Sequence, residues 1–477
     1  DALSKKSEIQ GYYKAIDTYA PWQWASRATI WRTHFIDNEY GFVGNGTNLD
    51  QISESRFYSS QPYWNGKHVF FQHSTNYTVA GNIFQSDNPN EIELPEENGY
   101  GIIAHSSGES GSRIFENDFT RLYQGLTIEG NNSHLQLKCN QFSQFAPSLD
   151  NEKRYPWYIT NITTGTLEPA LLGNQGTACL LGKTAGNLFY DEIPDQKHIY
   201  AATPVAFRYY AGGTPAETVP QKAGNATLIM IDECELLEAD TNTCPALPNL
   251  NGFSVGTDLG DALADYIKNN ALNEIDLSAR TAQATQYLLQ QDTTGLQATQ
   301  FLTAIDTRQA HRMLFSAYVH LSDTAHIQPY NLLVQTDTTL HPQLKEYYKL
   351  LHDVIVDNRN IYSLLPQEFT DIEILANSSG AAATYAQSLL AMMRLQTCRR
   401  NPQPIGQYKR NDYTDNSQNT LWVFPNPATT YINIAQGLLW EKATLFNLHG
   451  QKVASYSYNN YPTLTLPENL KQGIYIV

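Results

Sequence analysis

Cysteines and long apolar runs are scarce in this chain. Its 477 residues include five cysteines, none in a Cys-x-x-Cys pair or at a histidine spacing typical of zinc, so we expect neither a metal site nor a cofactor. No apolar run reaches about eighteen residues, so no membrane-spanning helix is predicted. The sequence starts at Asp1 without a signal peptide, and we treat it as a fragment of a longer chain.

Positive charge is also in deficit. Lys and Arg total 31 against 47 Asp and Glu, which gives a formal net charge of -16. Such a chain repels nucleic acid and anionic lipid, so neither nucleic acid nor a membrane is an expected partner. Only 16% of the residues are charged, whereas the sequence has 30 tyrosines, a composition typical of extracellular β-rich proteins.

A six-residue pattern recurs five times in the first half of the chain. It consists of an apolar residue, two variable residues, Asn, Ser or Thr, one variable residue and Phe. The copies stand at residues 30–35, 52–57, 79–84, 114–119 and 137–142. Their Phe positions are 22, 27, 35 and 23 residues apart. A period in the low twenties with β-forming residues and few leucines predicts the rungs of a right-handed parallel β-helix rather than a leucine-rich repeat.

The fourth position of the pattern predicts a ladder of polar side chains. An Asn at the same turn of every rung can pass amide hydrogen bonds to the rungs above and below, and Ser or Thr can replace it. The expected ladder residues are Thr33, Ser55, Asn82, Asn117 and Asn140. A weaker copy at residues 186–189 indicates that the rungs continue to about that point.

A catalytic β-helix would need carboxylates, or carboxylates and basic residues, that converge from adjacent rungs. The candidates flank the ladder positions of two rungs and are Glu54, Arg56, Glu116 and Asp118. Gly81 and Ile83 occupy the rung between these pairs. This separation favours solvated turn charges over an active site.

Other side chains could also bind a ligand or a partner. Aromatic residues such as Tyr12 and Trp31 could stack on sugar rings, although cap or core packing accounts for half or more of this group. No acidic residue stands at ligand spacing near His68 and His73, so we expect them on the surface. In an exported protein, a disulfide could close the short loop between the cysteines at the end of this region, Cys234 and Cys244.

Helical spacing replaces the repeat further along the chain. Tyr347, Tyr348 and Leu351 lie on one predicted helical face, and Pro342 stands at a suitable helix start. Similar stretches predict four or more helices between about 259 and 398. The segment 399–419 has the Pro-rich, polar composition of a linker.

Three short sequence motifs come after that linker. They are Val423-Phe424-Pro425-Asn426-Pro427, Leu445-Phe446-Asn447-Leu448-His449-Gly450 and Gly473-Ile474-Tyr475-Ile476-Val477. Their alternating residues and turn residues predict short strands of a small antiparallel sandwich. In this order they resemble the type A C-terminal sorting domain of type IX secretion cargo from Bacteroidota. The resemblance implies export by the type IX secretion machinery to the outer cell surface or the medium.

The resemblance also points to particular motif residues. These are Pro425, Asn426, Pro427, Gly450, Gly473 and Tyr475. Members of the family usually continue beyond the last strand, so we expect the sorting domain to be truncated at Val477.

The predicted fold class is multidomain and mainly β with an added α part: a parallel β-helix solenoid, an all-α helical module and a C-terminal β-sandwich. The expected domains are a β-helix at 1–205 that continues upstream, closing strands and a linker at 206–258, a helical module at 259–398, a linker at 399–419 and a sorting domain at 420–477.

The first functional hypothesis is a non-enzymatic cell-surface protein, either an adhesin or a subunit of a surface appendage. Its expected partners are the secretion machinery, further copies of itself in a homo-oligomer, and glycans or cell surfaces. The main alternative is a secreted polysaccharide lyase or hydrolase that uses the four charged residues beside the ladder. A third hypothesis is a β-helix that binds glycans without cleaving them.

Overall fold

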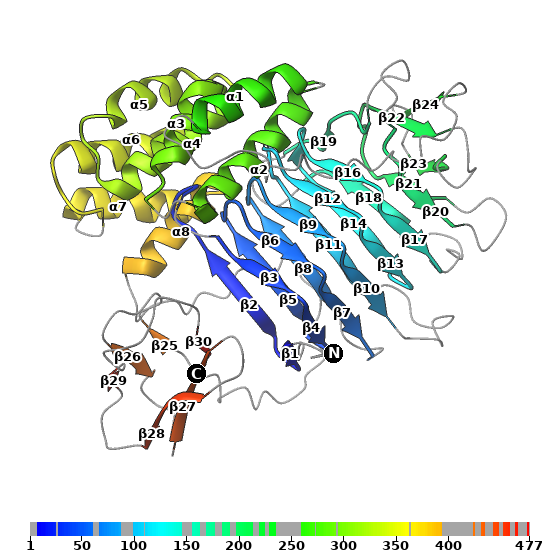
Figure 1. Ribbon diagram of the computed structural model, residues 1–477, viewed down its shortest axis with the longest axis horizontal. Helices are drawn as coiled ribbons and strands as arrows, with labels where there is room; N and C mark the ends of the chain where they lie inside the picture. The colour runs from blue at the N-terminus through cyan, green and yellow to red at the C-terminus, as the bar shows by residue number, and fades with distance from the viewer. Residues whose placement is uncertain are drawn as a thin grey trace. The chain divides into compact units, whose positions relative to one another are not determined.

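The computed structural model (Figure 1) divides into two compact units, Glu8–Leu390 and Asp1–Ser7 with Ala391–Val477. The structure describes residues 7–24, 27–60, 66–86, 99–108, 110–145, 155–162, 168–176, 184–190, 197–212, 219–224, 229–234, 259–271, 273–291, 294–361, 364–393, and, in the C-terminal part, 423–424, 431–434, 442–447, 452–457, 463–465 and 475–476.

Three parallel β-sheets make up the first part of the larger unit. Sheet A contains β1 (Ser7–Gln10), β4 (Thr33–Ile36), β7 (Arg56–Ser59), β10 (Ile83–Ser86), β13 (Asp118–Thr120), β17 (Gln141–Ser143) and β20 (Leu188–Phe189). Sheet B contains β2 (Lys14–Tyr19), β5 (Tyr40–Asn45), β8 (Lys67–Gln72), β11 (Tyr100–His105), β14 (Gln124–Glu129), β18 (Tyr155–Thr160), β21 (Ile199–Ala201) and β23 (Lys222–Gly224). Sheet C contains β3 (Thr29–Trp31), β6 (Gln51–Ser53), β9 (Thr78–Ala80), β12 (Arg113–Phe115) and β16 (Gln136–Lys138).

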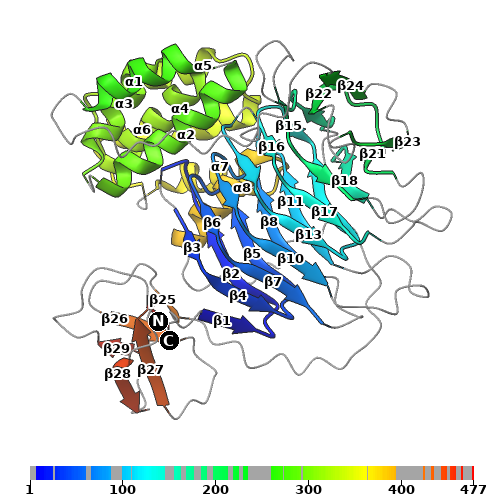
Figure 2. The same cartoon turned by 45° about the vertical axis from the view of Figure 1, so that its right-hand side comes forward.

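The chain visits the three sheets in turn, and we call one such cycle a rung. Each rung adds a strand to each sheet beside the strand of the preceding rung, as Figures 1 and 2 show for β5, β8 and β11. The predicted parallel strands are therefore confirmed. Four more strands form two short parallel pairs: β15 (Asn131–Asn132) with β19 (Leu171–Leu172), and β22 (Phe207–Gly212) with β24 (Ile229–Cys234).

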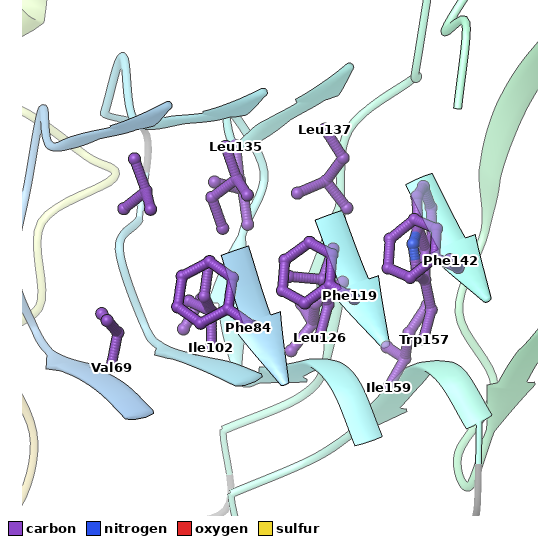
Figure 3. Close-up of a cluster of buried hydrophobic side chains, with 14 of the residues drawn as sticks. Val69, Phe84, Ile102, Phe119, Leu126, Leu135, Leu137, Phe142, Trp157 and Ile159 are labelled. Atoms are coloured by element: carbon purple, nitrogen blue, oxygen red, sulfur yellow. The ribbon is translucent and has the colours of Figure 1, made fainter. Parts of the chain in front are cut away.

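The Phe of the hexapeptide lies in sheet A and points into the space between the sheets. Neighbouring rings are almost parallel, with centroids 4.5–5.2 Å apart, and Figure 3 shows part of their stack. The stacked residues are Phe35, Phe57, Phe84, Phe119, Phe142 and Phe189. These rings are at most 2% exposed and pack against the apolar residues of sheets B and C, which makes one continuous core.

Glycines in sheet B lie directly beneath this Phe stack. A Cβ at Gly41 or Gly101 would come within 2.8 Å of a Phe ring carbon, and one at Gly125 within 3.0 Å. A larger residue at these positions would displace the rings, because side chains in a close-packed core have little room to move. This contact explains why a glycine comes six residues after the hexapeptide Phe in the first and fourth copies.

The turn between sheets C and A holds a column of buried asparagines. The Oδ1 atoms of Asn82, Asn117, Asn140 and Asn187 each accept a hydrogen bond from the backbone N–H of the equivalent residue one rung earlier, at 2.9–3.2 Å. Their Nδ2 atoms donate to sheet C carbonyls of that earlier rung, at 2.9–3.0 Å. At the other end of the column the Ser55 hydroxyl accepts from the N–H of Thr33. Consecutive rungs are thus joined by side-chain as well as backbone hydrogen bonds.

Eight helices come after the sheets within the described residues, which confirms the predicted helical part. They are α1 (Leu259–Asn270), α2 (Glu274–Gln291), α3 (Leu296–Ile305), α4 (Arg308–Leu321), α5 (Ile327–Thr336), α6 (Pro342–Val356), α7 (Pro366–Ala376) and α8 (Ala381–Met393). The predicted start at Pro342 coincides with the first residue of α6. Buried residues of α1 to α4 share a second core, to which the sheet part contributes Leu49.

The C-terminal unit consists of antiparallel strands in its described parts. One sheet has the order β25 (Val423–Phe424), β26 (Tyr431–Ile434) and β29 (Thr463–Thr465). The other has the order β28 (Lys452–Ser457), β27 (Lys442–Asn447) and β30 (Tyr475–Ile476). The strands lie close to the segments where alternation predicted them.

We expect Asn117→Ala to lower the free energy of unfolding by about 3 kcal/mol, because it leaves buried donors and acceptors of two neighbouring rungs without partners. Denaturant titration of the variant measures this loss. Gln141→Ala, at an exposed position on the next rung, is the matched control and should change stability by less than about 0.5 kcal/mol. Equal losses in the two variants would contradict a special role for the Asn column.

Candidate functional site

The two glutamates of the enzyme hypothesis occupy the turn position just before the ladder residue. The backbone is left-handed at this position in every copy, with φ between 49° and 66°, at Arg32, Glu54, Gly81, Glu116, Cys139 and Gly186. This conformation costs a non-glycine residue energy. Glu54 and Glu116 are exposed at this position. Glu54 binds the Arg32 guanidinium at 2.6 Å, and the hydrogen bond from Arg32 lowers the pKa of Glu54.

Arg56 and Asp118 begin strands of sheet A. Ile83 pairs with Arg56 on one side and with Asp118 on the other, so the two charged residues are two strands apart, about 10 Å. Arg56 donates to Gln85 at 2.7 Å, and Asp118 accepts from Thr120 at 3.1 Å. The structure therefore gives Glu54, Arg56 and Asp118 local partners and does not gather the four charged residues into one cluster.

Cys139 is disulfide-bonded and 8% exposed. Cys234 ends β24, whereas Cys244 lies outside the described residues, so the pairing of Cys234 with Cys244 stays a prediction. Among the described residues no group of three His, Cys, Asp or Glu side chains is placed to hold a metal ion.

The expectation that His68 and His73 lie on the surface is wrong. His68 is 3% exposed, and its ring packs against the rings of Phe57 and Phe84, at the position that glycine takes in neighbouring rungs. Burial lowers its pKa to about 3. His73 is 5% exposed, and burial, followed by the neighbouring His105, lowers its pKa well below the usual value. The sequence contains no pattern that indicates the burial of these two histidines, so their place in the core could not be predicted.

The outer face of sheet B carries a set of aromatic side chains outside the core. Its first residues form a column in register: Lys14, Tyr40, Lys67, Tyr100, Gln124 and Tyr155. The second and third residues of these strands both face the interior, as the Gly41 contact with Phe57 and the burial of Phe42 indicate. The fourth residues lie on the outer side again and form a second column, in which Val43, Ile103 and Thr127 are at most 5% exposed. The column consists of Asp17, Val43, Phe70, Ile103, Thr127, Tyr158 and Tyr200.

Ring contacts join the two columns. The rings of Tyr40 and Phe70 lie 6.3 Å apart, and those of Tyr155 and Tyr200 stack at 4.6 Å. Polar groups border the same face: His105 Nδ1 and Glu129 Oε2, 2.8 Å apart, lie at the far ends of their strands. This face was not predicted from the sequence, although its first column is marked by the residue before Gly41, Gly101, Gly125 and Pro156.

The helices dock on the turns between sheets B and C. Asn76 Oδ1 accepts from Gly111 N at 2.9 Å and from Gln309 Nε2 of α4 at 2.5 Å. A Cβ on Gly111 would lie 2.1 Å from the Ser278 carbonyl oxygen, so the sheet and α2 are in direct backbone contact. The Tyr347 hydroxyl of α6 donates to the Pro21 carbonyl at 2.6 Å. This interface of complementary buried polar groups fixes the helices to the rungs.

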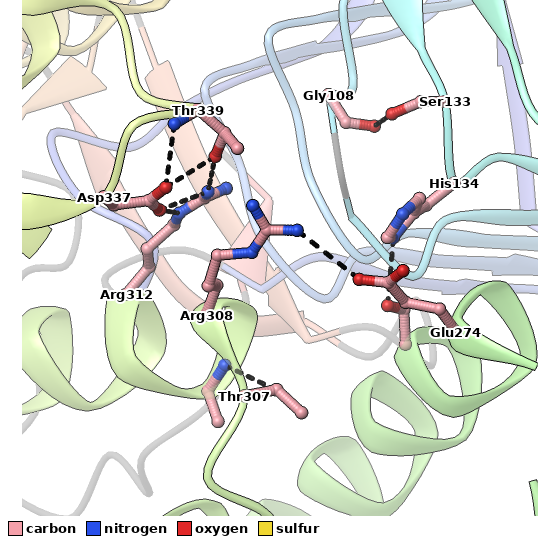
Figure 4. A network of polar contacts seen from close by, with 11 residues as sticks. Gly108, Ser133, His134, Glu274, Thr307, Arg308, Arg312, Asp337 and Thr339 are labelled. Carbon is pink, nitrogen blue, oxygen red and sulfur yellow. Dashed lines mark hydrogen bonds and ion pairs between the residues drawn. The ribbon is translucent and has the colours of Figure 1, made fainter. Parts of the chain in front are cut away.

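Two polar contacts of the helical part are visible in Figure 4. His134, from the sheet part, faces α2, where its Nδ1 lies 3.1 Å from Ser278 Oγ. Arg312 of α4 binds the buried carboxylate of Asp337 at 2.6 Å. These contacts leave the outer faces of sheets A and B outside the interface that the described residues form with the helices.

One buried carboxyl belongs to this docking corner. Asp50 is 1% exposed, its Oδ1 accepts from Ala28 N at 2.7 Å, and its Oδ2 has no hydrogen-bond partner among the described residues. Burial raises the pKa of Asp50 to about 7, although the hydrogen bonds from Ala28 and Thr47 oppose the rise. A polymer substrate could not reach this buried carboxyl. Its protonation state therefore affects the stability of the fold rather than catalysis.

We expect Asp50→Asn to remove a pH dependence of stability. The pKa of Asp50 in the folded protein lies above that of an Asp in the unfolded chain. The protonated carboxyl therefore contributes its full stabilisation below pH about 4, and this stabilisation is lost as the pH rises through 7. At pH 8 the variant should be the more stable protein, by up to about 4 kcal/mol, and the difference should shrink at pH 5.

Denaturant titrations at both pH values measure this difference. Asp265→Asn, which removes an exposed carboxyl from α1, is the control and should leave the difference between pH 5 and 8 unchanged. A parent protein with the same stability at pH 5 and 8 would show that Asp50 stays ionised.

The C-terminal motif residues lie mostly outside the described residues. This holds for Pro425, Asn426, Pro427, Gly450 and Gly473, whereas Tyr475 lies in β30 and pairs with Asn447 of β27. No described helix is both long and apolar enough to cross a membrane.

Comparison with known proteins identifies the C-terminal part. A family model described as the secretion system C-terminal sorting domain matches residues 422–477. No curated protein and no solved structure matches the chain. The sorting domain marks proteins that leave the cell by type IX secretion, so the protein is exported to the cell exterior or outer surface and interacts with that machinery.

Removal of residues 422–477 should keep the protein inside the cell, because the sorting domain is the part that the secretion machinery recognises. Fractionation of a type IX-competent host measures the exported share. Fusion of residues 422–477 to an unrelated reporter is the complementary test and should send the reporter out. Export of the truncated chain at the parent level would contradict this assignment.

Proposed function

We propose that the protein is a non-enzymatic adhesin on the outer cell surface. In this proposal the three sheets form a parallel β-helix, a stiff scaffold that presents a binding face. The observation that carries the proposal is the unbroken Asn column, because buried hydrogen bonds between rungs resist bending and separation. Seven rungs along sheet A correspond to a length of about 30 Å.

The remaining parts take supporting roles in this proposal. Residues 1–205 would form the β-helix, 206–258 its closing strands, 259–398 the docked helical module, 399–419 a linker and 420–477 the sorting domain, a small sandwich. The contacts of Gln309 and Tyr347 with the rungs support a helical module that moves together with the scaffold.

Self-association is a further part of the hypothesis. The outermost strands β1, β2 and β3 have a strand neighbour on one side only among the described residues. Such edges can pair with another chain, which is what a subunit of a surface appendage would require. Native mass measurement of the purified chain distinguishes a homo-oligomeric subunit from a monomeric adhesin.

The alternative function is a polysaccharide lyase or hydrolase that uses Glu116, Asp118, Glu54 and Arg56. Local partners favour a structural role for these side chains, because Glu54 is bound to Arg32 and Arg56 to Gln85. Glu54 lies two rungs, about 10 Å, from Glu116 and Asp118, so carboxylates of different rungs do not converge.

We expect the purified full-length chain to bind cell surfaces without releasing reducing ends from a panel of polysaccharides. The double variant with Glu116→Gln and Asp118→Asn should bind as well as the parent, because neither residue lies in the aromatic columns on the outer face of sheet B. Cell-binding and reducing-end assays measure the two properties. Release of reducing ends by the parent, abolished in the double variant, would establish the enzyme instead.

A further inference from the structure

The first column of sheet B's outer face alternates strictly between tyrosine and a long polar residue. Lys14, Lys67 and Gln124 alternate with the tyrosines, so that Tyr40, Tyr100 and Tyr155 recur on every second rung. Rungs are about 4.8 Å apart, so the tyrosines repeat at about 10 Å. The insertions that lengthen some rungs do not break this alternation.

Neighbouring side chains hold each tyrosine ring in place. Lys67 Nζ donates to the Tyr40 hydroxyl at 2.9 Å and lies 4.9 Å from the ring centroid. The Tyr100 ring meets that of Tyr123 edge-on at 5.5 Å, and Tyr155 stacks on Tyr200. Rings fixed in this way lose little conformational entropy when a ligand covers them.

The three tyrosines are partly exposed, so their rings are accessible in part to a ligand. The second outer column adds Phe70, Tyr158 and Tyr200. The rings of Tyr158 and Tyr200, which pair on neighbouring strands, stack at 5.5 Å. Polar residues at the strand ends, among them Gln72 and Glu129, border these aromatics. Aromatic faces beside hydrogen-bonding groups match a ligand that has both C–H faces and hydroxyl groups.

Charge excludes two other kinds of ligand. With a formal net charge of -16, the chain repels the phosphates of nucleic acid and of anionic lipid. The lysines of the column are already engaged, since Lys14 binds Asp17 at 2.7 Å and Lys67 binds Tyr40. A neutral ligand therefore fits this face better than a polyanion.

We propose that the outer face of sheet B binds a neutral, extended polysaccharide that runs along the stack of rungs. One disaccharide would span two rungs, because the two-sugar repeat of an extended β-linked chain has about the length of the tyrosine repeat. Alternate sugar rings stack on Tyr40, Tyr100 and Tyr155, and partly exposed polar residues at the strand ends, such as Gln72, bond to hydroxyl groups. This inference rests on the proposed adhesin function and names its ligand class.

Titration calorimetry of the full-length chain with neutral β-1,4-linked glucan, mannan and xylan oligosaccharides of two to eight sugars tests the proposal. At least one series should bind, with affinity rising in two-sugar steps. Tyr100→Ala should weaken binding about tenfold, whereas Tyr100→Phe, which keeps the ring, should stay near the parent. Tyr190→Ala, at an exposed tyrosine after sheet A, is the control and should bind like the parent.

Three outcomes would overturn the proposal. They are no binding to any neutral series, equal losses in Tyr100→Ala and Tyr190→Ala, or binding only to acidic polysaccharides that salt abolishes. Tyr155→Ala replaces Tyr100→Ala if the latter unfolds, and should give the same loss. Cleavage of a bound oligosaccharide would contradict the non-enzymatic function but not the binding of polysaccharide by this face. Cell adhesion without glycan binding would contradict only the binding of polysaccharide by this face.

Discussion

The hydrogen bonds of the Asn column are the interaction on which the remainder of the sheet structure depends. A buried amide needs partners for two donors and an acceptor, and water cannot supply them inside a packed turn. Asn117 finds all of them in the backbone and side chains of its own and the neighbouring rungs. Each rung therefore completes the hydrogen bonding of the next, and the same turn is repeated with the same geometry.

A repeated turn also fixes the positions of the residues that come after it in the chain. It places each hexapeptide Phe over a small residue or a ring of sheet B. Gly101 and the buried His68 therefore occupy equivalent positions of sheet B beneath the Phe stack. It also sets the register of the outer positions, which brings Tyr40 and Tyr100 onto alternate rungs of one face. The binding face is thus a consequence of the interior packing.

Much of the sheet part was predictable because its signal is local. The apolar, Asn and Phe positions fall within six residues and recur, whereas the outer columns of sheet B are separated by insertions that hide their alignment in the sequence. The docking of Gln309 on Asn76 could not be predicted, since complementary buried polar groups distant in sequence leave no pattern. The sorting domain was predictable from its three short sequence motifs alone, and the family match agrees with this prediction.

Native-state hydrogen exchange tests the central role of the Asn column most directly. The backbone amides of Ser55, Asn82, Asn117 and Asn140 each donate to a side chain of the next rung. If these bonds lock the rungs together, the four amides exchange only through global unfolding and share one protection free energy. Exchange through local opening, with smaller and unequal protection at the four positions, would contradict the account.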